Sequence, residues 1–208
     1  MTHTIGIDFD NTIVSYDALM YEAALDRGLI KDGADRTKRA VRDRIRQLPD
    51  GEIEWQKLQA LAYGPLMRRA QLIEGVQEFI CACRDRDIAI FIVSHKTEYA
   101  NYDETRTNLR TAALEWMTDK RFFDAEGFDL SRTDVYFEST RSDKIARIDR
   151  MGCSHFIDDL EEVLLEPSFP VHVEKILYAP DALSVSTGRV TVMPSWQAVR
   201  DYFFDRRT

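Results

Sequence analysis

Cysteine and long apolar runs are both scarce in this sequence. Its 208 residues include three cysteines, Cys81, Cys83 and Cys153, an odd number for which free thiols are the expected state. The four histidines are scattered along the chain, so His and Cys together lack the ligand spacing of a zinc site. No apolar run approaches the ~20 residues of a membrane span, and the N-terminal segment lacks the apolar stretch of a signal peptide. We therefore expect a cytoplasmic protein with no membrane partner and no zinc.

The sequence also has a deficit of positive charge. Its 36 Asp and Glu residues outnumber 28 Lys and Arg residues, which gives a net charge of −8. Phosphate backbones select for basic surfaces, so we expect no nucleic-acid partner. A small anionic ligand is still compatible with this charge, because one divalent metal and one lysine can reverse the local field.

The most informative segment lies near the N-terminus, where an apolar run over residues 4–7 leads into Asp8-Phe9-Asp10-Asn11. If this run is a strand, both carboxylates project at its C-terminal end, where open α/β sheets bind ligands. Paired carboxylates there can hold Mg²⁺, attack a phosphorus centre or handle protons. The alternative is that Asp8 and Asp10 are ordinary turn and helix N-cap residues.

Three further candidate sites follow in the chain. Ser94 ends an apolar strand, and a hydroxyl there can bind phosphate oxygens. Lys144 lies near the predicted start of a helix, where an ammonium and the helix N-terminus can face an anion together. Asp158 and Asp159 end another strand and can complete a magnesium site. Taken singly, each also fits a structural role: a loop serine, a solvated lysine and an N-cap pair.

Strands and helices alternate along most of the chain, which favours a doubly wound, mainly parallel α/β sheet. Residues 16–69 have no strand signal, and turn signals divide them into about three helices. We therefore expect an α/β core domain over 1–15 and 70–208, with a helical cap inserted over 16–69. The expected strands of the core after the insert are 88–93, 135–137, 155–157, 173–178 and 190–193, and its helices are 75–86, 105–120, 144–151 and 196–204.

The ordered series resembles the haloacid dehalogenase (HAD) superfamily of phosphotransferases. The family's first motif, an apolar strand followed by Asp-x-Asp-x-Thr, is matched by Asp8–Thr12, and its second, a strand ending in Ser or Thr, is matched by the strand that ends in Ser94. Its third motif, a lysine, is best matched by Lys144, with Arg141 a weaker alternative. Its fourth, a strand ending in an acidic pair, is matched by Asp158-Asp159. The insert stands where the family has its helical cap of the first type. The resemblance covers the whole chain, and only the four motifs together are specific.

The resemblance implies roles for the first motif. Asp8 would be the nucleophile that forms an aspartyl-phosphate, with one carboxylate oxygen on Mg²⁺. Asp10 would protonate the leaving group and then activate the hydrolytic water, while its backbone carbonyl binds the metal. Thr12 would position Asp10 and lie with the phosphate-binding residues.

The resemblance also assigns the other three motifs. Ser94 and Lys144 would hold the phosphoryl oxygens, and Lys144 would act in catalysis. Asp159 would be the main carboxylate ligand of Mg²⁺ from the last motif, with Asp158 as a direct or water-mediated ligand. Such a site suits phosphoryl transfer, in which the negative charge spreads over the equatorial oxygens.

The implied function is a Mg²⁺-dependent phosphatase of small phosphorylated metabolites. Asp10 favours phosphate-ester chemistry, because family members that displace halide lack this acid/base carboxylate. Two alternatives stay open: a phosphotransferase or mutase of the same superfamily, and a non-catalytic phosphate- or protein-binding module on the same fold. The second is disfavoured because all four motifs are intact.

The chain departs from the family pattern at Asn11, where many of the family's phosphatases carry glycine. Cleavage of a phosphorus–carbon bond would need a cap lysine able to form a Schiff base. The cap lysines Lys31, Lys38 and Lys57 have no visibly apolar setting that would lower their pKa, which disfavours this reaction.

Substrate selectivity is expected in the cap. Its candidate contacts, equally compatible with packing or surface roles, are Tyr16, Tyr21, Arg36, Arg39, Arg42, Trp55 and Tyr63.

Overall fold

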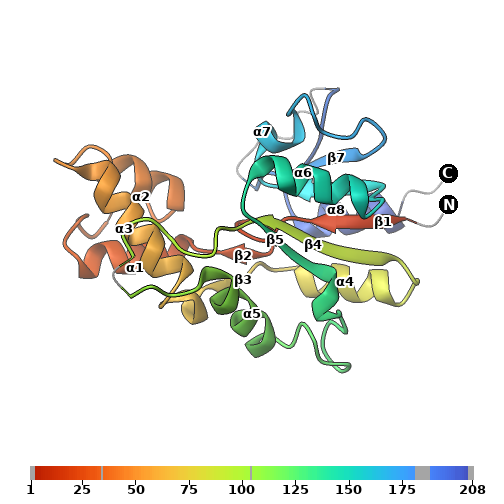
Figure 1. Cartoon of the computed structure of the whole chain (residues 1–208), viewed down its shortest axis with the longest axis horizontal. Helices are drawn as coiled ribbons and strands as arrows, with labels where there is room; N and C mark the ends of the chain where they lie inside the picture. Colours follow the sequence, from red (N-terminus) through yellow and green to blue (C-terminus); the bar gives the residue numbers. More distant parts are fainter. Residues whose placement is uncertain (1–2, 34, 104, 181–187, 206–208) are drawn as a thin grey trace. The chain divides into compact units, whose positions relative to one another are not determined.

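The chain folds around one parallel β-sheet. A computed structural model describes residues 3–33, 35–103, 105–180 and 188–205. The sheet has six strands in the order β5-β4-β1-β6-β7-β8 (Figure 1). These strands are β1 (Thr4–Ile7), β4 (Ala89–His95), β5 (Val135–Glu138), β6 (His155–Asp158), β7 (Glu174–Tyr178) and β8 (Thr191–Met193). All neighbouring pairs are parallel, which confirms the predicted α/β fold class.

The order of the strands reverses at β1, in the interior of the sheet. From β1 the chain proceeds to β4 and β5 on one side, then returns to β6, β7 and β8 on the other. In doubly wound sheets, ligands bind beyond the strand ends at this reversal. Ile5 and Ile7 are fully buried, as expected of a strand covered on both faces. Between them, a Cβ added to Gly6 would come within 2.5 Å of Phe156 Cδ2, so β6 packs against β1 only if this residue is glycine.

Helices cover both faces of the sheet. The covering helices are α4 (Val76–Arg84), α6 (Arg141–Arg150), α7 (Glu161–Leu164) and α8 (Trp196–Phe204). Figure 1 shows α6 and α7 on one side of the sheet and α4 on the other. Helices α4 and α8 pack together through Phe79 and Trp196, whose ring centroids are 5.2 Å apart. The hydrophobic core beneath α6 and α7 includes Val93, Ile145, Ile148, Phe156, Leu164 and Phe169.

The chain divides into two compact units. The sheet unit contains the chain up to Ile13, Leu72–His95 and the chain from Arg121 onward. The helical unit contains Val14–Gln71 and Lys96–Lys120. The helices of this second unit are α1 (Asp17–Asp26), α2 (Lys38–Ile45), α3 (Gly51–Tyr63), the 3₁₀ helix η1 (Met67–Arg69) and α5 (Leu109–Asp119). Its short strand β2 (Val14–Ser15) pairs with β3 (Gln71–Leu72).

The helical unit includes the predicted insert, residues 16–69, but extends beyond it. The added segment follows β4 and contains α5, which packs on η1 and α3. The indole Nε1 of Trp116 donates a hydrogen bond to the carbonyl of Ala70 at 2.9 Å. The backbone N–H of Leu109 donates to the carbonyl of Glu98, also at 2.9 Å. These contacts hold residues 96–120 in the helical unit, where the sequence prediction had placed them in the core.

Helices α5 and α6 begin several residues from their predicted starts, and a capping side chain sets the start of each. Helix α5 begins at Leu109 rather than at residue 105, because Asn108 Oδ1 accepts from two backbone N–H groups of its first turn. Helix α6 begins at Arg141 rather than at Lys144, because Thr140 Oγ1 accepts from the N–H of Asp143 at 3.1 Å. The earlier start places Lys144 at the end of the first turn of α6.

All three cysteines are free thiols, as predicted. Burial raises the pKa of Cys83 to about 12 and that of Cys153 to about 11, so both thiols stay protonated and unreactive at neutral pH. Across the described ranges, no helix combines the length and apolarity that crossing a membrane requires.

Candidate active site

The C-terminal ends of three adjacent strands bring the predicted site residues together. Ile7 of β1 pairs with Ile92 of β4 and with Ile157 of β6. The N–H of Asp8 donates to the carbonyl of Ile157 at 2.9 Å. Asp8 therefore lies between the end of β4, which carries Ser94, and the end of β6, which carries Asp158. This convergence follows from the register of three parallel strands.

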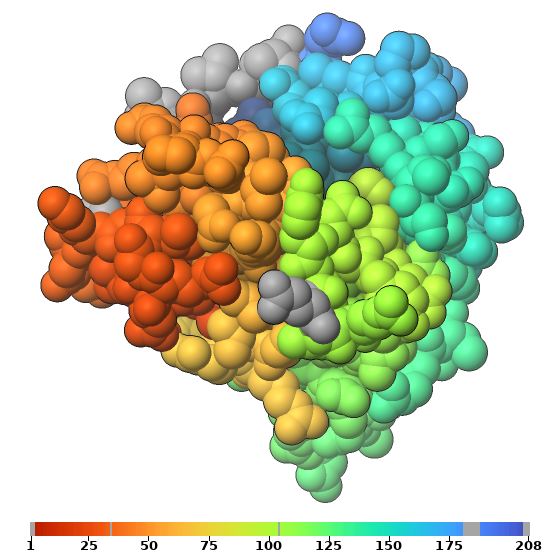
Figure 2. Space-filling view, turned by 60° about the vertical axis from the view of Figure 1, so that its left-hand side comes forward, coloured from red at the N-terminus to blue at the C-terminus, as the bar shows by residue number. Residues whose placement is uncertain are grey.

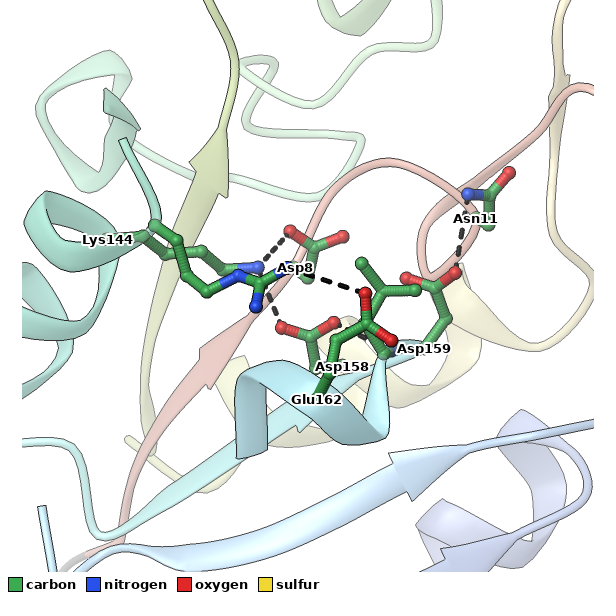
Figure 3. Close-up of polar contacts among 8 residues, drawn as sticks. Asp8, Asn11, Lys144, Asp158, Asp159 and Glu162 are labelled. Carbon is green, nitrogen blue, oxygen red and sulfur yellow. Dashed lines mark hydrogen bonds and ion pairs between the residues drawn. The ribbon is translucent and has the colours of Figure 1, made fainter. Parts of the chain in front are cut away.

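Lys144 bridges two carboxylates at this point. Its Nζ lies 2.6 Å from Asp8 Oδ1 and 2.7 Å from Asp158 Oδ2, and Figure 3 shows its side chain extending between them. The side chain of Lys144 is 2% exposed. The ammonium therefore provides buried charge-assisted hydrogen bonds that hold both acids in place.

The carboxylates of Asp8, Asp158 and Asp159 form one group, with a ligand oxygen from each within 4.8 Å of the others. Asp158 is fully buried, and its second oxygen, Oδ1, accepts from the N–H of Leu160 at 2.9 Å. Asp8 Oδ2 accepts no hydrogen bond from any residue that the structure describes. An all-oxygen group of this kind has the chemistry that Mg²⁺ prefers.

Asn11 supports the acidic pair from the first loop. Its φ of 62° lies in the left-handed region, which asparagine tolerates better than most residues. Its Nδ2 donates to Asp159 Oδ2 at 3.3 Å (Figure 3). The departure from glycine at this position therefore gives Asp159 a hydrogen-bond donor, a contact that sequence reasoning missed.

Burial dominates the electrostatics of Asp8. Burial raises the pKa of Asp8, Lys144 lowers it, and the charges of Asp158 and Asp10 raise it, so that the pKa is about 7. Burial lowers the pKa of Lys144, but the charges of Asp8 and Asp158 outweigh burial and raise it. Lys144 is therefore an ammonium at neutral pH. One ammonium among three carboxylates leaves surplus negative charge, which a divalent cation would neutralise.

The other first-motif residues lie nearby. Asp10 is close enough to Asp8 for its charge to raise that residue's pKa, but its carboxylate is not part of the three-acid group. Thr12 is completely buried, and its Oγ1 has no hydrogen-bond partner among the residues described. A buried hydroxyl without a partner is costly, and the expected role of Thr12 stays a prediction.

Of the two candidates for the third motif, Lys144 contacts Asp8 and Asp158, whereas Arg141 contacts other acidic residues. Arg141 pairs with Glu162 at 3.4 Å and with Glu166 at 3.7 Å, and its side chain is 42% exposed. Ser94 is buried at the end of β4, one strand from Asp8. Its predicted contact with phosphate stays a prediction.

No family model matches the sequence, and no curated protein matches it. Solved structures match its fold. A HAD-superfamily hydrolase of subfamily IA, variant 1, from Geobacter sulfurreducens has a TM-score of 0.59 at 13% identity, over 97% of this chain and 95% of its own. A HAD family hydrolase from Deinococcus radiodurans, solved with bound phosphate and sodium, has a TM-score of 0.56 at 14% identity. The match covers 98% of this chain and 96% of the hydrolase.

A third match is a phosphoserine phosphohydrolase-like protein from Francisella tularensis, with a TM-score of 0.56 at 12% identity. The match covers 98% of this chain and 100% of that protein. At these identities the matches establish fold, and each spans nearly the whole chain. They agree with the resemblance carried by the four motifs. The chain has the fold of the haloacid dehalogenase superfamily hydrolases.

Proposed function

We propose that the chain is a Mg²⁺-dependent phosphatase of small phosphorylated metabolites that works through an aspartyl-phosphate on Asp8. The observation that carries this proposal is the bridge from Lys144 to Asp8 and Asp158 beside Asp159. This bridge brings an ammonium and two carboxylates together where the sheet order reverses, which supports Asp8 as the proposed nucleophile. The HAD-type fold supports a phosphatase or mutase, and the site chemistry supports phosphoryl transfer.

Asp8 supplies the nucleophilic oxygen. Lys144 holds its Oδ1, which would leave the other oxygen, Oδ2, to attack the phosphorus atom. Attack forms an O–P bond and breaks the ester O–P bond, while Asp10 gives its proton to the departing alkoxide. Asp10 then takes a proton from water as that water attacks the phosphorus, which releases phosphate and restores the Asp8 carboxylate.

The residues that would hold Mg²⁺ are Asp8, Asp158 and Asp159, together with the backbone carbonyl of Asp10. The ion, when bound, would neutralise charge on the transferring phosphoryl group. Ser94 and Lys144 would bind phosphoryl oxygens, and the Thr12 hydroxyl would gain a partner. Asn11 would keep Asp159 oriented through its hydrogen bond.

Chelation is expected to remove activity. Without a divalent ion, the rate of phosphate release should fall below about one hundredth of the rate with Mg²⁺, and adding Mg²⁺ should restore it. Ca²⁺ should inhibit, because it takes more ligands at longer distances and would misplace Asp8. Phosphate release after treatment with a chelator, followed by titration of each ion, measures both effects. Equal rates with Mg²⁺ and Ca²⁺ would contradict the proposed ligand set.

The stability of the metal-free protein should fall as pH rises from about 4 to about 7. The pKa of Asp8 is raised from its ordinary value of 3.8 to about 7 in the folded state, so the folded state retains a proton that the unfolded state has lost. The loss should be on the order of a few kcal/mol. Melting temperatures in chelator measure it, with Asp8→Asn as the control that should flatten this part of the profile. If the melting temperature of Asp8→Asn falls with pH as steeply as that of the wild type, the loss of stability belongs to other titrating groups.

The same site is compatible with a phosphotransferase or mutase, which passes the phosphoryl group to a second alcohol instead of water. Whether the phosphoryl group passes to water or to a second alcohol depends on whether water is excluded from the site.

We also propose that the helical insert, residues 16–69, selects the leaving group.

A panel of phosphorylated sugars, nucleotides and amino-acid derivatives, assayed with Mg²⁺, tests the proposed activity. Free phosphate indicates hydrolysis, and a new phosphate ester in the presence of an added alcohol indicates transfer. Neither product from any member of the panel, with correctly folded protein, would favour the non-catalytic binding module.

A further inference from the structure

Trp196, the first residue of α8, is joined to the loop that carries the first motif. This tryptophan is 1% exposed, and its indole Nε1 donates a hydrogen bond to the backbone carbonyl of Thr12 at 2.9 Å. The two residues are 184 positions apart in the sequence, and both belong to the sheet unit. The bond therefore ties the last helix to the first loop within one compact unit.

The first loop is a short closed turn. The N–H of Ile13 donates to the carbonyl of Phe9 at 3.0 Å, so residues 10–12 lie within this turn. Asp10 is two residues before the carbonyl that Trp196 holds. Because the turn is short and closed by its own hydrogen bond, a shift of this carbonyl would also move Asp10.

Packing fixes the direction of the indole. The centroid of its ring system lies 5.2 Å from that of Phe79 on α4 and 5.8 Å from that of Tyr178 on β7. A Cβ added to Gly75, at the start of α4, would lie 2.7 Å from the Cβ of Trp196. The φ of Gly75 is 86°, in the left-handed region that favours glycine. The N–H donor of Trp196 is therefore held by groups from two other elements of the sheet unit.

The carbonyl that accepts this bond is cut off from bulk water, because Thr12 as a whole is 0% exposed. A buried carbonyl that loses its donor costs free energy unless it turns toward another donor. Such a turn would displace the loop. A proton donor must lie within hydrogen-bond reach of the leaving oxygen, and a misplacement of about 1 Å can cost about a hundredfold in rate.

We propose that Trp196 is a positioning residue, whose hydrogen bond to the Thr12 carbonyl holds Asp10 where it can protonate the leaving group. When the ester O–P bond breaks, its electron pair stays on the alcohol oxygen, and that oxygen takes the Asp10 proton. This inference rests on the proposed phosphatase function. It adds a residue from the C-terminal helix, outside the four motifs, to the groups on which the reaction depends.

Two substrates separate this role from a purely structural one. Propyl phosphate releases an alkoxide, which needs a proton, whereas p-nitrophenyl phosphate releases a phenolate that is stable without one. Trp196→Phe keeps an aromatic ring but removes the N–H. It should lower kcat/KM by at least about tenfold for propyl phosphate but by less than about threefold for p-nitrophenyl phosphate, since general acid catalysis contributes about 10²–10⁴-fold. A purely structural loss would lower both values by the same factor.

Trp116→Phe is the matched control. Trp116 is also fully buried, and its Nε1 donates to the carbonyl of Ala70 at the same distance, 2.9 Å. This bond joins the two parts of the helical unit, red to yellow for 14–71 and green for 96–120, which adjoin on the surface in Figure 2. The control should keep the wild-type ratio of the two kcat/KM values. A change in this ratio as large as that in Trp196→Phe would overturn the inference.

Hydrogen exchange provides a readout that does not depend on turnover. In Trp196→Phe the amides of residues 9–13 should exchange at least about fivefold faster than in the wild type, while those of β4 keep their rates. In Trp116→Phe the amides of residues 9–13 should be unaffected. Replacing Trp196 with benzothienylalanine keeps both fused rings and puts sulfur in place of the N–H, so this variant gives the same test if Trp196→Phe does not fold.

The outcomes distinguish the inference from the proposed function. Unchanged exchange over residues 9–13, or exchange that rises equally in β4, would overturn the inference. If the wild type hydrolyses both esters and the Trp196 variants lose activity equally on each, only the inference fails. If the wild type hydrolyses neither ester with Mg²⁺, the proposed function fails for these substrates, and the exchange of residues 9–13 decides whether Trp196 holds the loop.

Discussion

Replacing Asp8 with Asn is expected to reduce phosphate release by about 10⁴-fold or more, the scale of loss when a nucleophile is removed from an enzyme. The amide is nearly isosteric with the carboxylate but is a poor nucleophile and a poor magnesium ligand. The fold should survive, because the substitution removes a charge that is buried at 4% exposure. Steady-state phosphate release with Mg²⁺ measures the loss, and circular dichroism checks the fold.

The control is Asp26→Asn, which makes the same chemical change at an exposed position of α1 and should retain full activity. The metal-free Asp8→Asn protein should stay folded, because Asp158 still pairs with Lys144. Turnover near the wild-type rate in a pure Asp8→Asn preparation would remove Asp8 from the role of nucleophile.

Replacing Lys144 with Met should destabilise the metal-free protein by about 3–5 kcal/mol, the usual cost of breaking a buried ion pair from one side. The substitution keeps the volume of the side chain but leaves Asp8 and Asp158 as neighbouring buried carboxylates without their shared cation. Urea unfolding in the presence of a chelator measures the loss. Phosphate release should also fall, since the phosphoryl group would lose its ammonium partner.

A second substitution separates charge from packing. Asp158→Asn should destabilise the wild type, because Lys144 loses one of its two partners. Added to Lys144→Met, the same change removes one of the two repelling carboxylates and should recover part of the lost stability. Lys31→Met, at an exposed lysine, should leave the urea midpoint unchanged. If Lys144→Met also unfolds at the wild-type midpoint, the Lys144 bridge does not stabilise this protein.

The sheet could be predicted from the sequence because its signals are local. Buried parallel strands appear as unbroken apolar runs, and acidic or hydroxyl residues mark where β1, β4 and β6 end. The order of these motifs predicted which strand ends converge. The membership of residues 96–120 in the helical unit could not be predicted in this way, because it depends on contacts between distant residues such as Trp116 and Ala70.

The sequence indicated that Asp8, Lys144 and the acidic pair would lie together, as they do, but not the contacts that join them. The bridge from Lys144 to Asp158 and the hydrogen bond from Asn11 to Asp159 depend on side-chain geometry across strands, which no spacing rule encodes.

The most direct test of the account is to trap the phosphorylated residue. Protein turning over a small aryl phosphate with Mg²⁺ is quenched in acid and reduced with borohydride, which converts an aspartyl-phosphate into homoserine. Mass spectrometry of the peptides then locates the change. We expect homoserine at position 8 in the wild type and none in Asp8→Asn. Homoserine at another aspartate, or phosphate held on Ser94 or His95 instead, would contradict the assignment of Asp8 as the nucleophile.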